Sequence, residues 1–177
     1  QTGDSNVAIG FQAGSSLTTG GNNVLLGAYA GDALVQSGRN IAIGRNALST
    51  EDAAGRSVAI GYAALENQNA NEEAYNVAIG YEAGNDIITG IKNTIIGGLA
   101  GDALTTGSYN VVMGYNALTV EDTGGKSIAI GFSALANQNY DGSAYNVAVG
   151  HSAGASITTG TLNTIVGGQA GDALTEG

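Results

Sequence analysis

The sequence predicts an all-β fold, a parallel β-solenoid in which each short repeat forms one coil. Asn or Ser, three apolar residues and Gly recur as a motif ten times, 17 or 19 residues apart, and the apolar residues are mostly β-branched. The motifs begin at positions 6, 23, 40, 57, 76, 93, 110, 127, 146 and 163. Steps of 17, 17, 17 and 19 form a 70-residue period, and residues 6–75 match 76–145 at 35 of 70 positions. We therefore treat residues 1–177 as one repeat array.

The short repeat length excludes helical repeats. A pair of helices needs about 33 residues, and a glycine inside a helix costs about 1 kcal/mol, yet every repeat contains one. Coils stacked about 4.8 Å apart would form a rod of about 48 Å. The next motif would begin at position 180, so we expect this array to be part of a longer one.

Several columns of equivalent residues predict a packed interior. Because alternate strand residues share a face, we expect the first and third apolar residues of each motif, such as Val7 and Ile9, to point inward. Ala occurs seven residues after every motif start, which predicts a narrow interior. Side-chain volume is also exchanged between two positions of each coil. Where the residue after this Ala is Gly, the residue three positions beyond that Gly is Leu or Ile. Where the residue after this Ala is Leu, the residue three positions beyond that Leu is Glu or Gln. The Leu-bearing coils pair Leu48, Leu65, Leu118 and Leu135 with Glu51, Gln68, Glu121 and Gln138.

The middle apolar residue of each motif is predicted to point outward. Strands that are apolar on both faces are usually buried on both, so this stripe predicts contact with neighbouring copies, most simply in a homotrimer. The stripe begins Ala8, Leu25, Ala42, Ala59, Ala78 and Ile95.

Composition excludes several classes of protein. The chain has 15 acidic and 5 basic residues, a net charge of −10, and no Cys or Pro. The acidic balance disfavours nucleic acids and anionic membranes as partners, and a disulfide framework is impossible without cysteine. The 30 glycines lack the Gly-X-Y repeat of collagen. No apolar run approaches the length of about 20 residues that spans a bilayer, and no signal peptide is visible.

The motifs resemble two families of fibrous proteins. The runs Asn76–Gly84 and Ser57–Leu65 are similar to the head repeats of trimeric autotransporter adhesins. Together with turns such as Thr105-Thr106-Gly107, they also resemble bacteriophage tail-fibre repeats. Over residues 6–177 the resemblance implies a left-handed β-roll of three chains, an extracellular fibre shaft or head that contributes to attachment, and no catalytic residue. Coils of 17 and 19 residues are longer than those of the adhesin heads, which favours the tail-fibre comparison.

No residue is predicted to be catalytic, to bind a cofactor or to bind a metal ion. His151, the only histidine, follows Tyr81 and Phe11 in its column, so we interpret it as a structural planar side chain. Ser152 is its neighbour, and adjacent strand residues face opposite ways, which does not suit a nucleophile and its base. Gly97-Gly98 and Gly124-Gly125 are not followed by the helix of a Walker-type phosphate loop and are interpreted as turns. The Asn column is interpreted as a hydrogen-bonded ladder.

A ligand-binding solenoid is the alternative function, with calcium, ice or a glycan as the ligand. Calcium is suggested by recurring acids at Asp32, Asp102 and Asp172 and at Glu51-Asp52 and Glu121-Asp122, although surface ion pairs with Arg39, Arg56, Lys92 and Lys126 explain them more simply. Ice binding is suggested by Thr18-Thr19, Thr105-Thr106 and Thr158-Thr159, but acidic and amide side chains interrupt that array. The 19-residue repeats are expected to bulge at 66–75 and 136–145, where Tyr75, Tyr140 and Tyr145 could contact a glycan.

Overall fold

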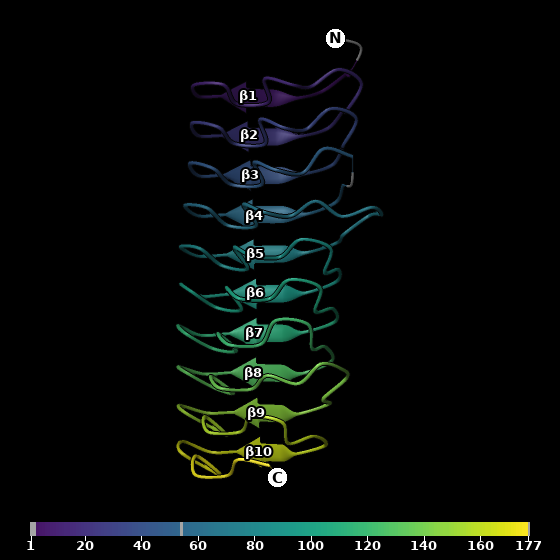
Figure 1. Ribbon diagram of the computed structural model, residues 1–177. Helices are drawn as coiled ribbons and strands as arrows, with labels where there is room; N and C mark the ends of the chain where they lie inside the picture. The colour runs from purple at the N-terminus through teal and green to yellow at the C-terminus, as the bar shows by residue number, and fades with distance from the viewer. Residues whose placement is uncertain (1–2, 54, 177) are drawn as a thin grey trace.

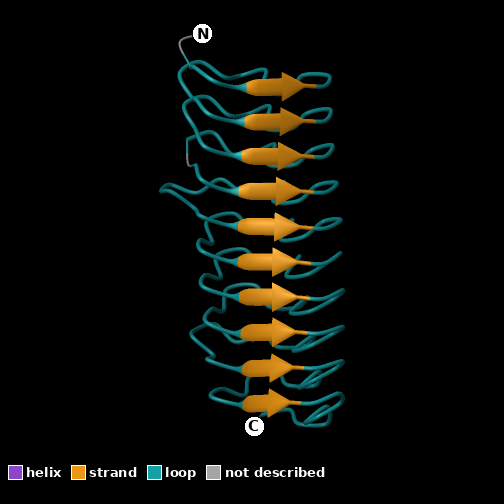
Figure 2. Cartoon of the chain, turned by 180° about the vertical axis from the view of Figure 1, so that it is seen from behind, coloured by secondary structure: helices purple, strands orange, loops and turns teal. Residues whose placement is uncertain are grey.

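The computed structural model describes residues 3–53 and 55–176 as a single stack of coils, each with one three-residue strand (Figure 1). The strands are β1 (Val7–Ile9), β2 (Val24–Leu26), β3 (Ile41–Ile43), β4 (Val58–Ile60), β5 (Val77–Ile79), β6 (Thr94–Ile96), β7 (Val111–Met113), β8 (Ile128–Ile130), β9 (Val147–Val149) and β10 (Thr164–Val166). Each strand pairs in parallel with the next, so that one ten-stranded sheet runs along the rod (Figure 2). Equivalent motif residues are direct partners, as in Val58 opposite Val77. This confirms the predicted parallel β-solenoid, while left-handed coiling and three-chain assembly stay predictions.

A glycine column turns the chain sharply after each strand. Gly114 has φ +134, a backbone conformation that L side chains rarely adopt. A Cβ atom on Gly114 would lie 2.4 Å from the carbonyl oxygen of Gly131 on the next coil. The invariant spacing of this glycine therefore has two causes, backbone conformation and the close stacking of coils.

The structure corrects the predicted orientation of the strands. The middle residue of each motif points into the lumen: Leu25, Ala59 and Ile95 are completely buried. The flanking residues point outward, as shown by the exposed fractions of 43% for Leu26 and 36% for Ile79. A three-residue strand gives one face a single side chain and the other face two, and the narrow lumen takes the single one. The stripe of Ala8, Leu25, Ala42, Ala59, Ala78 and Ile95 is thus no contact surface for neighbouring copies, since five of these six residues are buried and only Ala8, in the first coil, is exposed.

The exchange of bulk between positions is confirmed by the packing. Coils with Gly31, Gly84 or Gly101 bury Leu34, Ile87 or Leu104 in the space that the glycine leaves. A Cβ atom on Gly31 would lie 2.6 Å from Cδ1 of Leu34 and 2.8 Å from Cδ2 of Leu25. The alanine column lies in the same core. The lumen is therefore filled by complementary side chains from successive coils.

The asparagine column forms the predicted ladder. Oδ1 of Asn93 accepts a hydrogen bond from the backbone N–H of Asn110 at 2.9 Å, and its Nδ2 donates to the carbonyl of Gly107 at 2.9 Å. The same pair of bonds recurs from Asn110 to Ser127 and Gly124. The side chains thus satisfy backbone groups that the short strands leave unpaired.

The longer repeats add a bulge and a small second core. The loop between β4 and β5 protrudes from the stack (Figure 1), as the sequence predicts, and Glu72 and Glu73 at its tip are exposed. Ala70 and Ala74 are nevertheless buried and pack against Ile91 of the next coil. The bulge is therefore anchored at both sides of its tip.

Candidate functional site

The outward face of the sheet is apolar along most of the rod, with Thr94 and Thr164 as its polar members, and we call it the outer sheet face. It consists of the first and third residues of each strand, from Val7 and Ile9 to Thr164 and Val166. Met113 in mid-rod is 37% exposed, and the two end coils are more exposed, with 61% for Ile9 and 69% for Val166. Contiguous apolar surfaces of this kind are typical of sites of protein–protein contact.

An aromatic column lies directly after the glycine of the motif. The rings of Tyr115, Phe132 and His151 stack on successive coils, with centroids 5.8 and 5.0 Å apart and interplanar angles of 20° and 11°. Tyr62 and Tyr81 stack in the same way at 5.3 Å. The interpretation of His151 as a planar member of this column is therefore confirmed by its contacts.

His151 and Ser152 lie in the turn after β9, and not within a strand as the sequence analysis assumed. Ser152 has φ +55 and uses its backbone N–H to bond the carbonyl of Phe132 at 2.7 Å. Gly97 and Gly98 also lie in turns, with φ +137 at Gly97, and Gly124 donates its N–H to Oε1 of Glu121. These residues have structural contacts that account for them.

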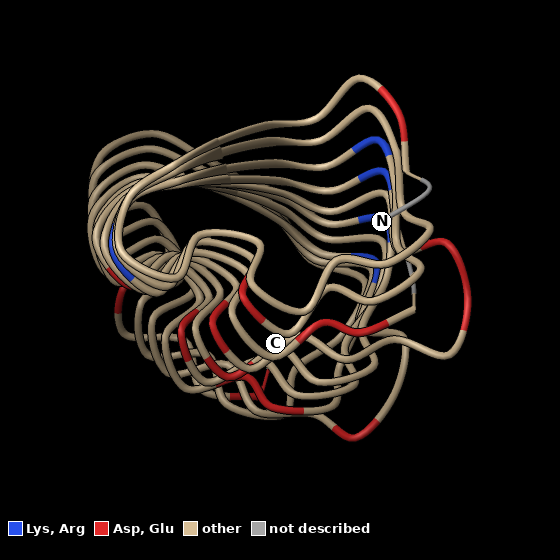
Figure 3. Cartoon of the chain, turned by 90° about the horizontal axis from the view of Figure 1, so that it is seen from above, with Lys and Arg blue, Asp and Glu red and all other residues tan. Residues whose placement is uncertain are grey.

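A second ladder occupies the residue before each Asn or Ser, and we call it the cation–tyrosine column. It reads Arg39, Arg56, Tyr75, Lys92, Tyr109, Lys126 and Tyr145 over successive coils. The cations of Arg56, Lys92 and Lys126 lie 5.3, 5.2 and 5.2 Å from the ring centroids of the tyrosines that follow them. Cation–aromatic contacts at this distance are favourable even at exposed sites. Figure 3 shows most of the basic residues along one edge of the rod, and acidic residues on several loops, some of them at this same edge.

Ion pairing at this column differs from the prediction. Among the described residues, Arg56 and Glu73 form the one ion pair. Arg56 also bonds the hydroxyl of Tyr75, which is the main cause of the raised pKa of Arg56. Lys92 and Lys126 instead donate to tyrosine hydroxyls, at 3.3 Å to Tyr109 and 3.2 Å to Tyr145. The Lys126 ammonium lowers the pKa of Tyr145.

The predicted acidic groups separate into buried and exposed positions. Glu51 and Glu121 are fully buried in the lumen, where Gln68 donates to Glu51 at 3.0 Å and Gln138 donates to Glu121 at 2.8 Å. Their partners Ser57 and Asn76, or Ser127 and Asn146, complete a buried polar network in each period. The expectation that Glu51 and Glu121 are surface groups is therefore wrong.

Burial dominates the pKa values of three acids. It raises the pKa of Glu121, and the hydrogen bonds from Gln138, Gly124 and Tyr140 lower it by less. Burial also raises the pKa of Asp32 and Asp102. In residues 3–53 and 55–176 no three acidic, histidine or cysteine side chains group as metal ligands do. The calcium alternative therefore has no clustered ligands to support it there.

The threonine pairs bond the protein itself. The hydroxyls of Thr18, Thr105 and Thr158 donate to the carbonyls of Val35, Asp122 and Thr175 on the following coils, at 3.0, 3.1 and 3.2 Å. These hydroxyls hold adjacent coils together. Ice binding requires a regular array of threonines with free hydroxyls, so these internal hydrogen bonds disfavour that function.

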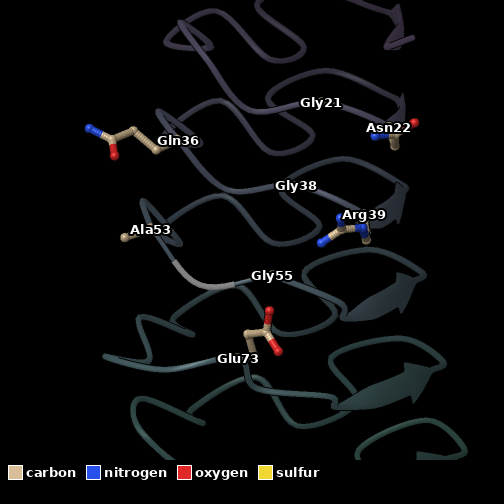
Figure 4. Close-up of a pocket in the computed structure, with 8 residues that line it drawn as sticks. All are labelled: Gly21, Asn22, Gln36, Gly38, Arg39, Ala53, Gly55 and Glu73. Atoms are coloured by element: carbon tan, nitrogen blue, oxygen red, sulfur yellow. The ribbon is translucent and has the colours of Figure 1, made fainter. Parts of the chain in front are cut away.

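A groove recurs beside the cation–tyrosine column in both periods. In the second period the groove has a volume of about 250 Å³ and is lined by Thr106, Ser108, Tyr109, Thr123, Gly125, Lys126, Gly142 and Ser143. In the first period it has about 260 Å³ and is lined by Gly21, Asn22, Gln36, Gly38, Arg39, Ala53, Gly55 and Glu73 (Figure 4). The sequence predicts a contact role for Tyr145, next to this region, and no groove, although Lys and Tyr recur here every 17 or 19 residues.

Comparison of the chain with profiles of protein families, with curated proteins and with solved structures found no match. The fold defines the chain as a β-solenoid repeat protein. No helix in the described part of the chain is long and apolar enough to cross a membrane.

Proposed function

We propose that this array is a structural segment, shaft or head, of an extended adhesive fibre, in a phage tail fibre or a bacterial surface adhesin. Its role in this proposal is mechanical extension and display outside the cell or virion, and it is not an enzyme. The observation that carries the proposal is the uninterrupted register of ten strands, which makes a rod whose length grows with repeat number.

The outer sheet face supports association of several copies, a homotrimer in our proposal. Ile60 in β4 and Ile79 in β5 lie on this face, and Ile79 is 36% exposed. A row of Val and Ile exposed to water along the rod is unfavourable by about 25 cal/mol per Å², and a neighbouring copy would cover it. This surface replaces the middle-residue stripe as the proposed contact.

Sedimentation equilibrium combined with circular dichroism tests this proposal. The wild-type chain is expected to sediment with three times the chain mass and to give a β spectrum. Ile60→Lys places a charge in the outer sheet face and should yield monomers with an unchanged spectrum. Val120→Lys adds the same charge at a 44% exposed turn residue and should leave the trimer intact.

A monomeric wild-type chain would overturn the proposed association, and so would an Ile60→Lys variant that remains trimeric. The location is tested separately by immunogold labelling of intact particles and cells with an antibody against this segment. Label confined to the cytoplasm would contradict a fibre.

A further inference from the structure

The second-period groove lies where three chain segments enter consecutive strands. Thr106–Tyr109 precede β7, Thr123–Lys126 precede β8, and Gly142 and Ser143 precede β9. Backbone bonds join the segments: Lys126 N–H donates to Ser108 at 3.1 Å, and Gly125 N–H donates to Gly142 at 2.9 Å. The groove is therefore held by the same stacking that forms the rod, and its lining comes from three successive coils.

The first-period groove is the same feature of the fold with different side chains. Six lining residues of the first groove have counterparts in the second groove one 70-residue period later. The pairs are Gln36 and Thr106, Gly38 and Ser108, Arg39 and Tyr109, Ala53 and Thr123, Gly55 and Gly125, and Glu73 and Ser143. Figure 4 shows the side chains of Arg39 and Glu73 on different coils, with the backbone of Gly55 between them. The exchange adds hydroxyl groups and an aromatic ring to the second groove.

The exchange also leaves a positive charge without an anionic partner. In the first period Glu73 forms an ion pair with Arg56. At the equivalent positions of the second period Ser143 replaces Glu73 and Lys126 replaces Arg56. Lys126 has no ion pair among the described residues and contacts only Tyr145 through its ammonium group, at 3.2 Å. Within the groove of the second period, Lys126 is therefore a cation without an acidic partner, whereas Arg56 of the first period has one.

The surroundings of Lys126 fit a sugar acid. Tyr109 and Tyr145, on the coils before and after, are 50% and 51% exposed. The ammonium groups of Lys92 and Lys126 lie 5.2 Å from the two ring centroids, and the rest of each ring is open to solvent. Sugar rings stack their C–H faces on aromatic rings, their hydroxyls bond groups such as those of Thr106 and Ser143, and a carboxylate pairs with an ammonium. A nucleic acid would need many more cations.

The acidic rim limits how much negative charge the ligand carries. The Asp141 carboxylate accepts the Thr123 hydroxyl at 3.0 Å, and Asp122 accepts the Thr123 N–H at 2.7 Å. Both carboxylates bond Thr123, at the start of the segment 123–126, whereas Lys126 is the last residue of that segment. A ligand with spaced carboxylates and neutral hydroxyls is accommodated better than a densely charged one.

From this geometry we propose that the second-period groove binds a uronic-acid oligosaccharide, with one carboxylate on Lys126 and sugar rings beside Tyr109 and Tyr145. A groove of about 250 Å³ is slightly smaller than the common range of ligand clefts of about 300–1,000 Å³. The oligosaccharide therefore fills it with one ring and continues along the rod. This site rests on the proposed attachment function and gives it a ligand class.

Isothermal titration of the assembled wild-type protein with trigalacturonate tests the site. Saturable binding is expected with a dissociation constant on the order of 1 mM or tighter. Lys126→Gln should weaken binding about tenfold, as the loss of one charge-assisted hydrogen bond does. Ser143→Glu should weaken it similarly by restoring the internal anion of the first period. Arg45→Gln removes the same charge from the column after the glycine and should bind like wild type.

Two ligand controls identify the chemistry. The methyl ester of trigalacturonate keeps the rings without the charge, and triglutamate keeps the charge without the rings, so both should bind at least about tenfold more weakly. Absence of wild-type binding, equal binding by Lys126→Gln, or equal binding of either control ligand would overturn the proposal. Sedimentation of each sample separates the two proposals, since a trimer that fails to bind contradicts only the glycan site, whereas a monomer that binds contradicts only the fibre assembly.

Discussion

Leu65 and Gly84 occupy the same position in successive coils, and Cδ2 of Leu65 lies 3.3 Å from the point that a Cβ atom of Gly84 would occupy. The leucine of one coil thus fills space that the glycine of the next leaves open. The side chains of Ile87 and Ile95 fill the rest, with Cδ1 atoms 3.1 and 3.0 Å from the same point. Lumen volume is therefore shared between neighbouring coils as well as within each one.

Gly84→Leu should overpack this part of the lumen. The new side chain would meet Leu65, Ile87 and Ile95, all of them completely buried and within 3.3 Å of the Cβ position. We expect a loss of about 1–3 kcal/mol in the free energy of unfolding, as overpacked cores show. Urea denaturation followed by circular dichroism measures it.

Adding Ile87→Ala to Gly84→Leu provides the control, because it removes the volume into which the new side chain would extend. The double variant should recover part of the lost stability. A double variant less stable than both single variants would contradict the shared-volume interpretation.

Gly114→Ala should be costly for a different reason. Its Cβ atom would collide with the backbone oxygen of Gly131 at 2.4 Å, and the residue has φ +134. Strained backbone conformations of this kind cost about 1–3 kcal/mol each, and the collision adds to this because backbone cannot rotate away as a side chain can. The midpoint of urea unfolding should fall accordingly.

Gly168→Ala is the matched control, since nothing lies within 4 Å of its Cβ position. Its effect should stay within about 0.5 kcal/mol, as for ordinary surface substitutions. Equal effects of the two substitutions would show that the coil contact at Gly114 is unimportant.

Asn110→Ala should interrupt the asparagine ladder in mid-rod. Oδ1 of Asn110 accepts the N–H of Ser127 at 2.9 Å, and Nδ2 donates to Gly124 at 3.1 Å, so the change leaves two buried backbone groups unpaired. Each unpaired group costs about 1–3 kcal/mol. Asn139→Ala alters an exposed asparagine and should change the unfolding free energy little. Hydrogen exchange at Ser127 N–H reports the break directly, and unchanged protection there would refute the ladder.

The repeat spacing predicted the coil, the register and the ladder because each depends on backbone periodicity. The prediction of which strand residues point into the lumen was wrong, because Val and Ile at the first and third positions of each strand were assumed to be interior. The coupling of Leu25 with Gly31 and of Ile95 with Gly101 was the signal for the true orientation, since a bulky middle residue needs the space beside a glycine.

The groove could not be predicted in the same way. It depends on how the extended loop of the 19-residue repeat is placed against the preceding coil, and the length of that loop alone does not determine its path. The burial of Glu51 and Glu121 was also hidden, because an acid enters a lumen only when neighbouring coils supply donors such as Gln68 and Gln138.

The buried carboxyl group of Glu121 should make stability depend on pH. Burial raises its pKa above the ordinary value of 4.5, so the folded chain holds a proton that the unfolded chain releases between 4.5 and the raised value. This contribution is fully present below 4.5 and is lost as pH rises through the raised pKa of the folded state. Burial acts in the same direction on Asp32 and Asp102. The wild-type unfolding free energy should therefore increase as the pH is lowered from about 8 to about 5.

Glu121→Gln removes one titrating group while keeping an oxygen that can accept the N–H of Gly124. Its unfolding free energy, from urea titrations at several pH values, should vary less with pH than that of wild type. Glu72→Gln removes one charge from an exposed loop position and controls for the change in net charge. It should retain the wild-type slope. If Glu121→Gln keeps the full slope as well, the pH dependence arises elsewhere, and the buried carboxyl group is not its source.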